Sequence, residues 1–260
     1  MIEIDQTVRQ NIFEKLEEIE ANNNIKILFA CESGSRGWQF PSPDSDYDVR
    51  FIYLKPMKYY LSIAEQTDQL DFPINEELDI NGWDLRKVLQ LLYKSNSTPF
   101  EWLQSPIIYR EEERFPQRLV NLGTSYFSRR TQTHHYLGIS KGALDTAVNG
   151  REIRIKKLFY VLRPLLAALW CVEKNSVPPM MINPLLTLMP TELKDLTEEL
   201  IALKLTKEES YVIEIPTSLQ SYIIDTYRYC EDASKGFEKK RFDYGPLDEF
   251  FVNQLDQYEY

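Results

Sequence analysis

The fold of this chain is constrained most by one stretch, Cys31 to Tyr53, which reads CESGSRGWQFPSPDSDYDVRFIY. An apolar run from Ile25 to Ala30 leads into a Gly34-Ser35 turn, and a second apolar run begins at Val49. Short apolar runs bounded by glycine, proline and aspartate are typical of strands joined by a loop. The stretch therefore predicts a strand, a glycine turn, a loop and a second strand.

Two carboxylates open the second strand. Alternate side chains of an extended chain share a face, so Asp46 and Asp48 point the same way while Tyr47 and Val49 pack on the other side. Neighbouring carboxylates repel unless a cation lies between them, and oxygen ligands favour a hard ion such as Mg²⁺. An EF-hand is excluded, because Val49 stands where the loop glycine is needed and Lys55 where the final glutamate is needed. We therefore expect metal ligands at Asp46 and Asp48.

The glycine turn supplies the other half of a candidate site. Glycine lets the backbone approach a ligand closely, and the amides of such a turn, together with the Ser35 hydroxyl, can hold phosphate oxygens. Gly34, Ser35 and the adjacent Arg36 are therefore candidate nucleotide-binding residues. A phosphate cradle beside metal-binding carboxylates predicts metal-assisted attack on a nucleoside triphosphate.

The remaining apolar patterns predict the elements around this stretch. Helical spacing indicates helices over residues 4–22, 57–65, 85–93, 115–147, 151–174, 191–204, 217–236 and 247–255, with a further helical piece from residue 99. Residues 75–79 lead into a third strand, which places Asp79 beside the first two carboxylates, and residues 106–109 form a short extended segment. Asp84 is suited to cap the helix that follows it. The patterns predict an α+β protein, with a small mixed-sheet domain over residues 1–112 and a helical domain over residues 113–260.

A basic group lies at the start of the helix predicted over residues 151–174. It consists of Arg151, Arg154, Lys156, Lys157 and Arg163. Arg154 and Lys157 are three residues apart and would share a face of a helix, so they are candidates for binding the triphosphate. The alternative is a solvated helix face.

Composition and motifs exclude several classes. The net charge of −10 argues against a broad grip on duplex nucleic acid. Three widely separated cysteines favour a reducing, cytoplasmic setting, and we expect neither a signal peptide nor a membrane span. His134 and His135 are adjacent and diverge on a helix, so a zinc site is not expected, and no Gly-x-Ser-x-Gly elbow indicates a hydrolase. Trp38 lies in the loop that joins the two predicted strands, which we call the motif loop. It is the aromatic residue best placed for base stacking, although most aromatic side chains fill cores.

The stretch resembles a known family. Gly-Ser followed by a loop and Asp-x-Asp is similar to the DNA polymerase beta nucleotidyltransferase superfamily, and the longer string CESGSRGWQF...DSDYDVRFIY resembles its predicted-nucleotidyltransferase branch, which includes RNA-ligase-associated polymerase-like proteins. The resemblance continues through LDINGWDLRK (78–87), EWLQSP (101–106) and FYVLRP (159–164). One departure is Gln39, where the family pattern has glycine.

The resemblance implies a function and a mechanism. The third carboxylate of the family falls on Asp79, with Asp84 as the competing choice. Two Mg²⁺ ions would be bridged by Asp46 and Asp48, and Asp79 would bind the ion that activates an acceptor hydroxyl, which attacks the α-phosphorus of a nucleoside triphosphate such as ATP. The acceptor stays open between an RNA end, which the relatives favour, a small alcohol and a protein hydroxyl. The alternative function is a catalytically inactive nucleotide-binding module that acts through a protein partner.

Overall fold

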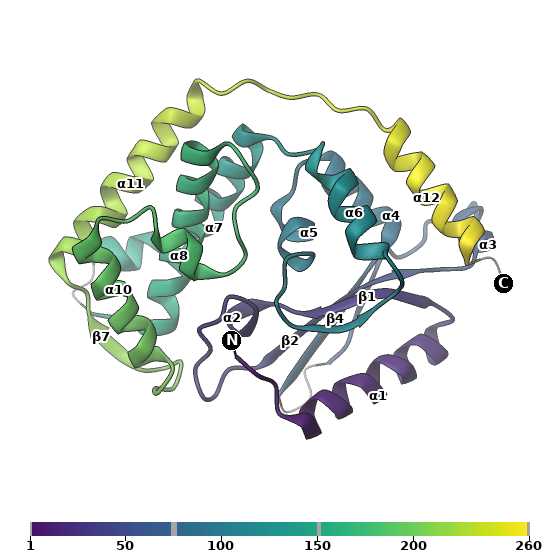
Figure 1. The fold of residues 1–260 in the computed structure, drawn as a ribbon, viewed down its shortest axis with the longest axis horizontal. Helices are drawn as coiled ribbons and strands as arrows, with labels where there is room; N and C mark the ends of the chain where they lie inside the picture. Colours follow the sequence, from purple (N-terminus) through teal and green to yellow (C-terminus); the bar gives the residue numbers. More distant parts are fainter. Residues whose placement is uncertain (1, 74–76, 150–151, 259–260) are drawn as a thin grey trace.

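The chain forms a mixed sheet flanked by helices, joined to a largely helical half (Figure 1). The computed structural model describes residues 2–73, 77–149 and 152–258. Within these residues the larger sheet has five strands in the order β3-β4-β2-β1-β5. Their bounds are β1 (Lys26–Glu32), β2 (Tyr47–Leu54), β3 (Gln69–Asp71), β4 (Leu78–Asp84) and β5 (Ile108–Glu111). A mixed sheet accompanied by many helices confirms the predicted α+β class.

The pairing of β2 with β4 matters most for the site. β1 runs antiparallel to both β2 and β5, and β3 runs antiparallel to β4. β2 and β4 are parallel, and their register sets Asp48 opposite Asp79. Because parallel strands begin at the same edge of a sheet, the carboxylates at the start of β2 and β4 meet there.

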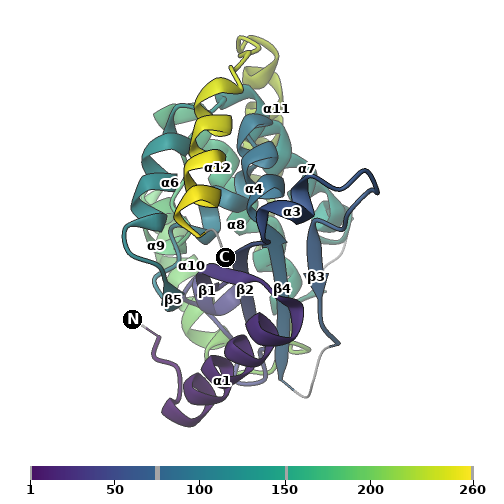
Figure 2. The same cartoon turned by 90° about the vertical axis from the view of Figure 1, so that its right-hand side faces the viewer.

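Helices cover both faces of the sheet, on opposite sides of the strands in Figures 1 and 2. One face packs on α1 (Gln6–Asn23), against which Val49 and Phe51 of β2 are buried. On the opposite face Ile52 and Leu54 are buried in a second cluster, as the alternation of a strand requires. That cluster includes α4 (Leu85–Tyr93), α5 (Ser97–Trp102), α6 (Phe115–Thr124) and α12 (Gly245–Gln257). Two single-turn helices, α2 (Gly34–Gly37) and α3 (Met57–Tyr60), follow β1 and β2.

The helical half is built around one buried helix. α8 (Ile155–Lys174) supplies nearly half of its buried core residues and packs on α7 and α11. The other elements are α7 (Arg129–Asn149), α9 (Ile182–Leu186), α10 (Thr191–Lys204), α11 (Thr217–Lys235) and a two-stranded sheet of β6 (Glu152–Arg154) and β7 (Val212–Glu214).

Three predicted helices differ from the structure. The helix predicted over residues 115–147 is divided into α6 and α7, because Ser128 interrupts it and its hydroxyl accepts the amide of Thr131 at the start of α7. The helix predicted over residues 57–65 ends at Tyr60, since the side chains beyond it, Leu61 and Ile63, are exposed and have no core to enter.

The third difference concerns the helix predicted over residues 151–174. Residues 152–154 are strand β6, which pairs with β7, and the helix begins at Ile155; Arg151 lies outside the described residues. The other predicted helices agree with the structure to within a few residues at their ends. The third strand begins at Leu78, and Asn75, within its predicted approach, also lies outside the described residues.

The end of the chain returns to the sheet. In Figure 1 the segment after α11 passes over the molecule to α12, which packs on α4. The proposed division into residues 1–112 and 113–260 therefore has two helices of the second part, α6 and α12, packed in the core of the first. In the part of the chain that the structure describes, no helix is long and apolar enough to span a bilayer.

Candidate active site

The glycine turn and the Asp48 carboxylate of β2 are in direct contact. Gly34 has φ +54°, a conformation that L side chains rarely adopt. A Cβ atom added to it would lie 1.9 Å from Oδ2 of Asp48, so only glycine leaves room for that carboxylate. The Ser33 amide donates to the Asp48 carbonyl at 2.8 Å, which fixes the turn against β2. The structure thus brings together the two halves of the candidate site.

The residues after Gly34 tie the turn to the motif loop. Ser35 is buried, and its carbonyl accepts the amide of Phe40. Arg36 donates to the backbone carbonyls of Ser45 (2.6 Å) and Asp46 (3.2 Å). Its guanidinium also lies 4.0 Å from the ring centroid of Tyr47. Arg36 therefore positions Asp46, a role that the sequence did not indicate.

Gln39 shows why glycine suits its position. Its φ of 74° lies in the left-handed region, where glycine is free of strain. The Gln39 side chain offsets part of that strain, because it donates to the Arg36 carbonyl and accepts the amide of Ile2.

The three predicted carboxylates lie near one edge of the sheet. Asp46 is exposed at the end of the motif loop, and Asp48 is half-buried in β2. Asp79 is opposite Asp48 on β4. Burial raises the pKa of Asp48, and the nearby Arg50 opposes that rise. The register therefore sets Asp79 beside Asp48, while Asp46 precedes them in the loop before β2.

Arg50 joins two of these carboxylates. Its Nη2 lies 2.8 Å from Oδ1 of Asp48 and 2.7 Å from Oδ2 of Asp79. Its Nη1 donates to the carbonyls of Asp79 (2.7 Å) and Val49 (3.1 Å). The alternation of β2 puts Arg50 on the same face as Asp48, but the bridge to Asp79 depends on the parallel pairing with β4.

Glu32 is a site-adjacent carboxyl that the sequence analysis did not single out. It is fully buried at the end of β1, where Oε1 accepts the amide of Asp48 (2.9 Å) and Oε2 accepts the Tyr109 hydroxyl (2.5 Å). Burial raises the pKa of Glu32 to about 7. An acidic residue directly after an apolar strand was the available signal. Glu32 holds the backbone of Asp48 in place.

Asp84 has the structural role predicted for it. Its side chain caps α4 by accepting the Arg86 amide at 2.8 Å, and it also accepts the Tyr60 hydroxyl at 2.9 Å. It is buried, and burial raises its pKa to about 6. Asp84 lies at the far end of β4 from Asp79, so of these two carboxylates only Asp79 is beside Asp48.

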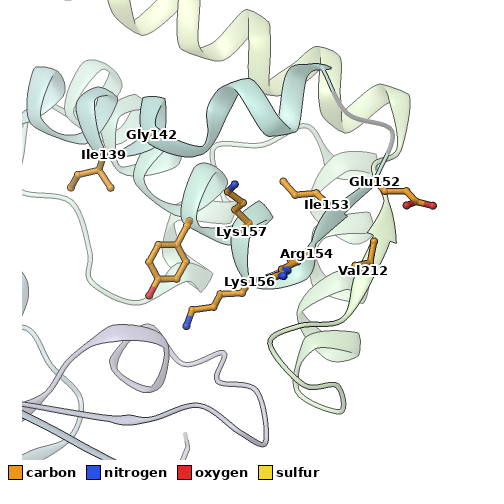
Figure 3. A pocket seen from close by; sticks show the side chains of 9 residues that line it. Ile139, Gly142, Glu152, Ile153, Arg154, Lys156, Lys157 and Val212 are labelled. Atoms are coloured by element: carbon orange, nitrogen blue, oxygen red, sulfur yellow. The ribbon is translucent and has the colours of Figure 1, made fainter. Parts of the chain in front are cut away.

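A broad pocket of about 1040 Å³ lies in the helical half, where it is lined by residues of α7, β6, α8 and β7 (Figure 3). Its cationic lining comes from β6 and the start of α8, namely Arg154, Lys156 and Lys157. The sequence placed Arg154 and Lys157 on one helical face. That was wrong for Arg154, which ends β6 with an extended backbone, although both residues line the pocket.

Lys156 points from this pocket toward the motif loop (Figure 3). It forms an ion pair with Glu209, which also accepts the Ser45 hydroxyl at 2.8 Å. Burial lowers the pKa of Lys156, while the negative charges of Glu209 and Asp46 raise it. The raising effects are together the larger, so the pKa of Lys156 lies above its ordinary value. Glu209 therefore links the helical half to the loop that carries Asp46.

Tyr160 connects the pocket with the carboxylates. It lines the large pocket and a smaller hollow of about 90 Å³ next to it, which is also lined by Trp38. Burial raises the pKa of Tyr160, Lys156 lowers it, and Asp48 raises it, so Tyr160 is within electrostatic reach of β2. Trp38 packs edge-on to Tyr160 with ring centroids 5.5 Å apart.

The last member of the predicted basic group is part of the core. Arg163 is 2% exposed and forms an ion pair with Glu101 at 2.6 Å. Tyr136 donates to the same carboxylate at 2.7 Å, and the Met180 carbonyl accepts from Arg163 at 3.0 Å. This network holds α5, α7 and α8 together.

The donor set agrees in chemical type with a hard divalent ion. Asp48 presents a carboxylate beside the glycine turn, Asp46 lies two residues before it, and Mg²⁺ is bound in proteins through one or two carboxylates together with substrate phosphates. The third carboxylate, Asp79, is paired with Arg50. Among the described residues no group of three or more His, Cys, Asp or Glu side chains is arranged to hold a metal ion.

A mixed sheet that carries a glycine turn against one strand carboxylate, with a further carboxylate in register on a parallel strand, is the arrangement expected of a polymerase beta-like nucleotidyltransferase. The chain belongs to the RNA repair pathway DNA polymerase beta family, RlaP, whose match covers residues 8–253. This confirms the family resemblance of the motif stretch.

The chain is also similar to two individual proteins. The uncharacterized protein YcgL of Bacillus subtilis (strain 168) is 42% identical over 204 residues, which cover 78% of this chain and 78% of that protein. The crystal structure of a nucleotidyltransferase-like protein from Exiguobacterium sibiricum 255-15 is similar over 88% of this chain and 74% of that protein's chain. The sequence identity is 12% and the TM-score is 0.32. A TM-score this low does not establish a shared fold.

Proposed function

We propose that this protein is a metal-dependent nucleotidyltransferase that transfers a nucleoside monophosphate from a nucleoside triphosphate to an acceptor hydroxyl. The observation that carries the proposal is the register of β2 and β4, which sets Asp79 opposite Asp48 where Gly34 packs on the Asp48 carboxylate. Membership of a polymerase beta family supports it.

The motif stretch binds the nucleotide. The backbone of Gly34 and Ser35 approaches the triphosphate, since a turn that lacks a Cβ exposes its amides. Asp46 and Asp48 would hold the two proposed Mg²⁺ ions, and Asp79, opposite Asp48, would be the third ligand. When bound, these ions supply neutralisation of the phosphate charge and a lowered pKa of the acceptor hydroxyl.

The chain's own residues orient the reactants. Arg36 holds the backbone carbonyl of Asp46 and Glu32 holds the backbone amide of Asp48, so these two carboxylates need little rearrangement during the reaction. Arg154 and Lys157 line the adjacent pocket, where their charge favours phosphate oxygens. Catalysis then rests on positioning and charge, without a covalent enzyme intermediate.

An RNA end is the acceptor that we favour. The family description places its members in an RNA repair pathway. The overall charge of −10 is unfavourable for a long nucleic acid, so the contact is restricted to the end of the strand at the basic pocket. Small alcohols and protein hydroxyls are the competing acceptors.

The test is a transfer assay with α-labelled nucleoside triphosphates. Each of the four nucleotides is offered with Mg²⁺ and with RNA ends, small alcohols or proteins as acceptors. We expect label on RNA with the wild type and a loss of at least about a hundredfold for Asp48→Asn, because a metal-binding carboxylate is removed. Asp195→Asn, an exposed position on α10, is the matched control and keeps full activity.

The outcome separates enzyme from binder. Label on no acceptor, combined with Mg²⁺-dependent nucleotide binding, would identify an inactive nucleotide-binding module. Transfer that persists in Asp48→Asn would remove Asp48 from the mechanism.

A further inference from the structure

Arg50 lies where two carboxylates of the proposed site come together. The alternation of β2 sets it on the face of Asp48, and the parallel register brings Asp79 to the same point. A single nitrogen, Nη2, is 2.8 Å from Oδ1 of Asp48 and 2.7 Å from Oδ2 of Asp79. Both oxygens are thus directed at one cationic atom.

The rest of the guanidinium is also held by the two strands. Nη1 donates to the carbonyls of Asp79 at 2.7 Å and Val49 at 3.1 Å. The side chains of Arg50, Asp48 and Asp79 are 17%, 26% and 31% exposed, so water screens the three charges only in part. Hydrogen bonds between charged groups in such a setting are among the stronger ones in proteins.

A divalent ion shared by Asp48 and Asp79 would need the same oxygen atoms. Mg²⁺ binds carboxylate oxygen at about 2.1 Å, nearer than any guanidinium nitrogen approaches, so the ion and Nη2 cannot occupy this point together. The ion pairs of Arg50 are with Asp48 and Asp79, and its Nη1 bonds are to the carbonyls of Val49 and Asp79. An ion at Asp46 and the second oxygen of Asp48 therefore does not meet this competition.

We propose that Arg50 is an internal counter-ion that competes with a divalent ion for Asp48 and Asp79. The proposal rests on the proposed function for the identity of these two residues as metal ligands. It assigns to Arg50 a positioning role: it keeps the paired carboxylates neutralised, and an ion shared by them binds only when Arg50 releases them.

Metal affinity without nucleotide measures this competition. The full chain is treated with chelator and titrated with Mn²⁺, and the free ion is followed by electron paramagnetic resonance. We expect Arg50→Gln to bind Mn²⁺ about tenfold or more tightly than the wild type, a ratio equivalent to about 1.4 kcal/mol. Arg50→Lys retains a charge but cannot bridge both carboxylates as a planar fork, so its affinity falls between the two.

Two further variants identify the cause of the gain. Arg110→Gln is the matched control, because Arg110 also pairs with carboxylates, Glu20 at 2.8 Å and Glu112 at 3.9 Å, but on β5. It should leave Mn²⁺ affinity unchanged. Asp79→Asn in the Arg50→Gln background should abolish the gain, since the ion then loses one of the two oxygens that Arg50 had held.

Equal or weaker Mn²⁺ binding by Arg50→Gln would overturn the proposal and show that Arg50 arranges the carboxylates for the ion. A gain that survives Asp79→Asn would also overturn it, because a general change of charge would then be the cause. If Arg50→Gln fails to fold, Arg50→Lys decides: affinity no tighter than the wild type contradicts the competition. Since no turnover is measured, a failure of nucleotidyl transfer leaves this result unaffected.

Discussion

The carboxyl group of Glu32 is fully buried and accepts hydrogen bonds from the Asp48 amide and the Tyr109 hydroxyl. Burial raises its pKa from 4.5 to about 7. The folded state therefore favours the protonated carboxyl. This contribution to stability is fully present below pH 4.5, where both folded and unfolded chains are protonated, and it is lost as the pH rises through about 7.

Glu32→Gln should remove this pH dependence. Glutamine resembles the protonated acid, since its oxygen accepts the Asp48 amide and its nitrogen donates to the Tyr109 hydroxyl. Between pH 4.5 and 7 the wild type should lose up to about 3 kcal/mol of unfolding free energy relative to the variant, because a tenfold change in a proton equilibrium is worth about 1.4 kcal/mol. Urea unfolding of both proteins at a series of pH values measures the difference. A difference independent of pH would mean that Glu32 is charged in the folded protein.

Sequence reasoning singled out the candidate site residues that stand in a recognisable pattern and missed their partners. Asp46 and Asp48 follow from the period of a strand, and Gly34 from its turn. Glu32 lies in β1 and Arg50 lies in β2. The residues that they contact depend on which strands are neighbours and on the register in which those strands pair. Spacing along one strand does not contain that information.

At the scale of elements, the long periodic segments were predicted and the short pairings were not. α4, α10 and α11 agree with their predicted ranges closely, because each has a sustained apolar face. β6 and β7 are too short to show a period, and they form because residues 152–154 and 212–214 meet in space. Because of that pairing, Arg154 is the last residue of β6, and α8 begins after it, at Ile155.

The two ends of β4 allow its two aspartates to be separated. Asp84 caps α4 and accepts the Tyr60 hydroxyl, so Asp84→Ala should lower the unfolding free energy by about 2 kcal/mol while transfer activity persists. Asp84→Asn should cost less, since asparagine also caps helices. Asp79→Asn should do the opposite: turnover is lost while the protein still binds nucleotide through Asp46 and Asp48.

Urea unfolding and the labelled-nucleotide assay, applied to the same three variants, check this assignment. Loss of turnover in Asp84→Asn, with activity retained in Asp79→Asn, would transfer the catalytic role to Asp84.

At the scale of the whole molecule, the helical half is coupled to the sheet in two ways. Glu209 and Lys204 reach the motif loop, where Glu209 accepts the Ser45 hydroxyl and Lys204 donates to Ser42 at 3.0 Å. Burial lowers the pKa of Lys204 to about 8. Its hydrogen bond to Ser42 joins the end of α10 to the motif loop. The second coupling is α12, which returns to pack on α4.

Leu247→Ala tests whether α12 is part of the sheet domain. Leu247 is 2% exposed and packs in the cluster that contains Leu85, Phe115 and the β-sheet side chains of that face. Its truncation should cost about 2–5 kcal/mol, the usual range for a buried leucine. Val252→Ala, on the same helix but 51% exposed, is the matched control and should cost little.

Hydrogen exchange locates where that stability is lost. If α12 completes the core of the first half, Leu247→Ala speeds exchange in β1, β2 and α4 more than in α8 and α11, whose buried side chains belong to a different cluster. If residues 1–112 instead form a domain that is stable without the rest, their exchange is unchanged and only α12 opens. The first result would extend the catalytic domain to include α6 and α12, because both helices bury their apolar side chains on the sheet that holds Asp48 and Asp79.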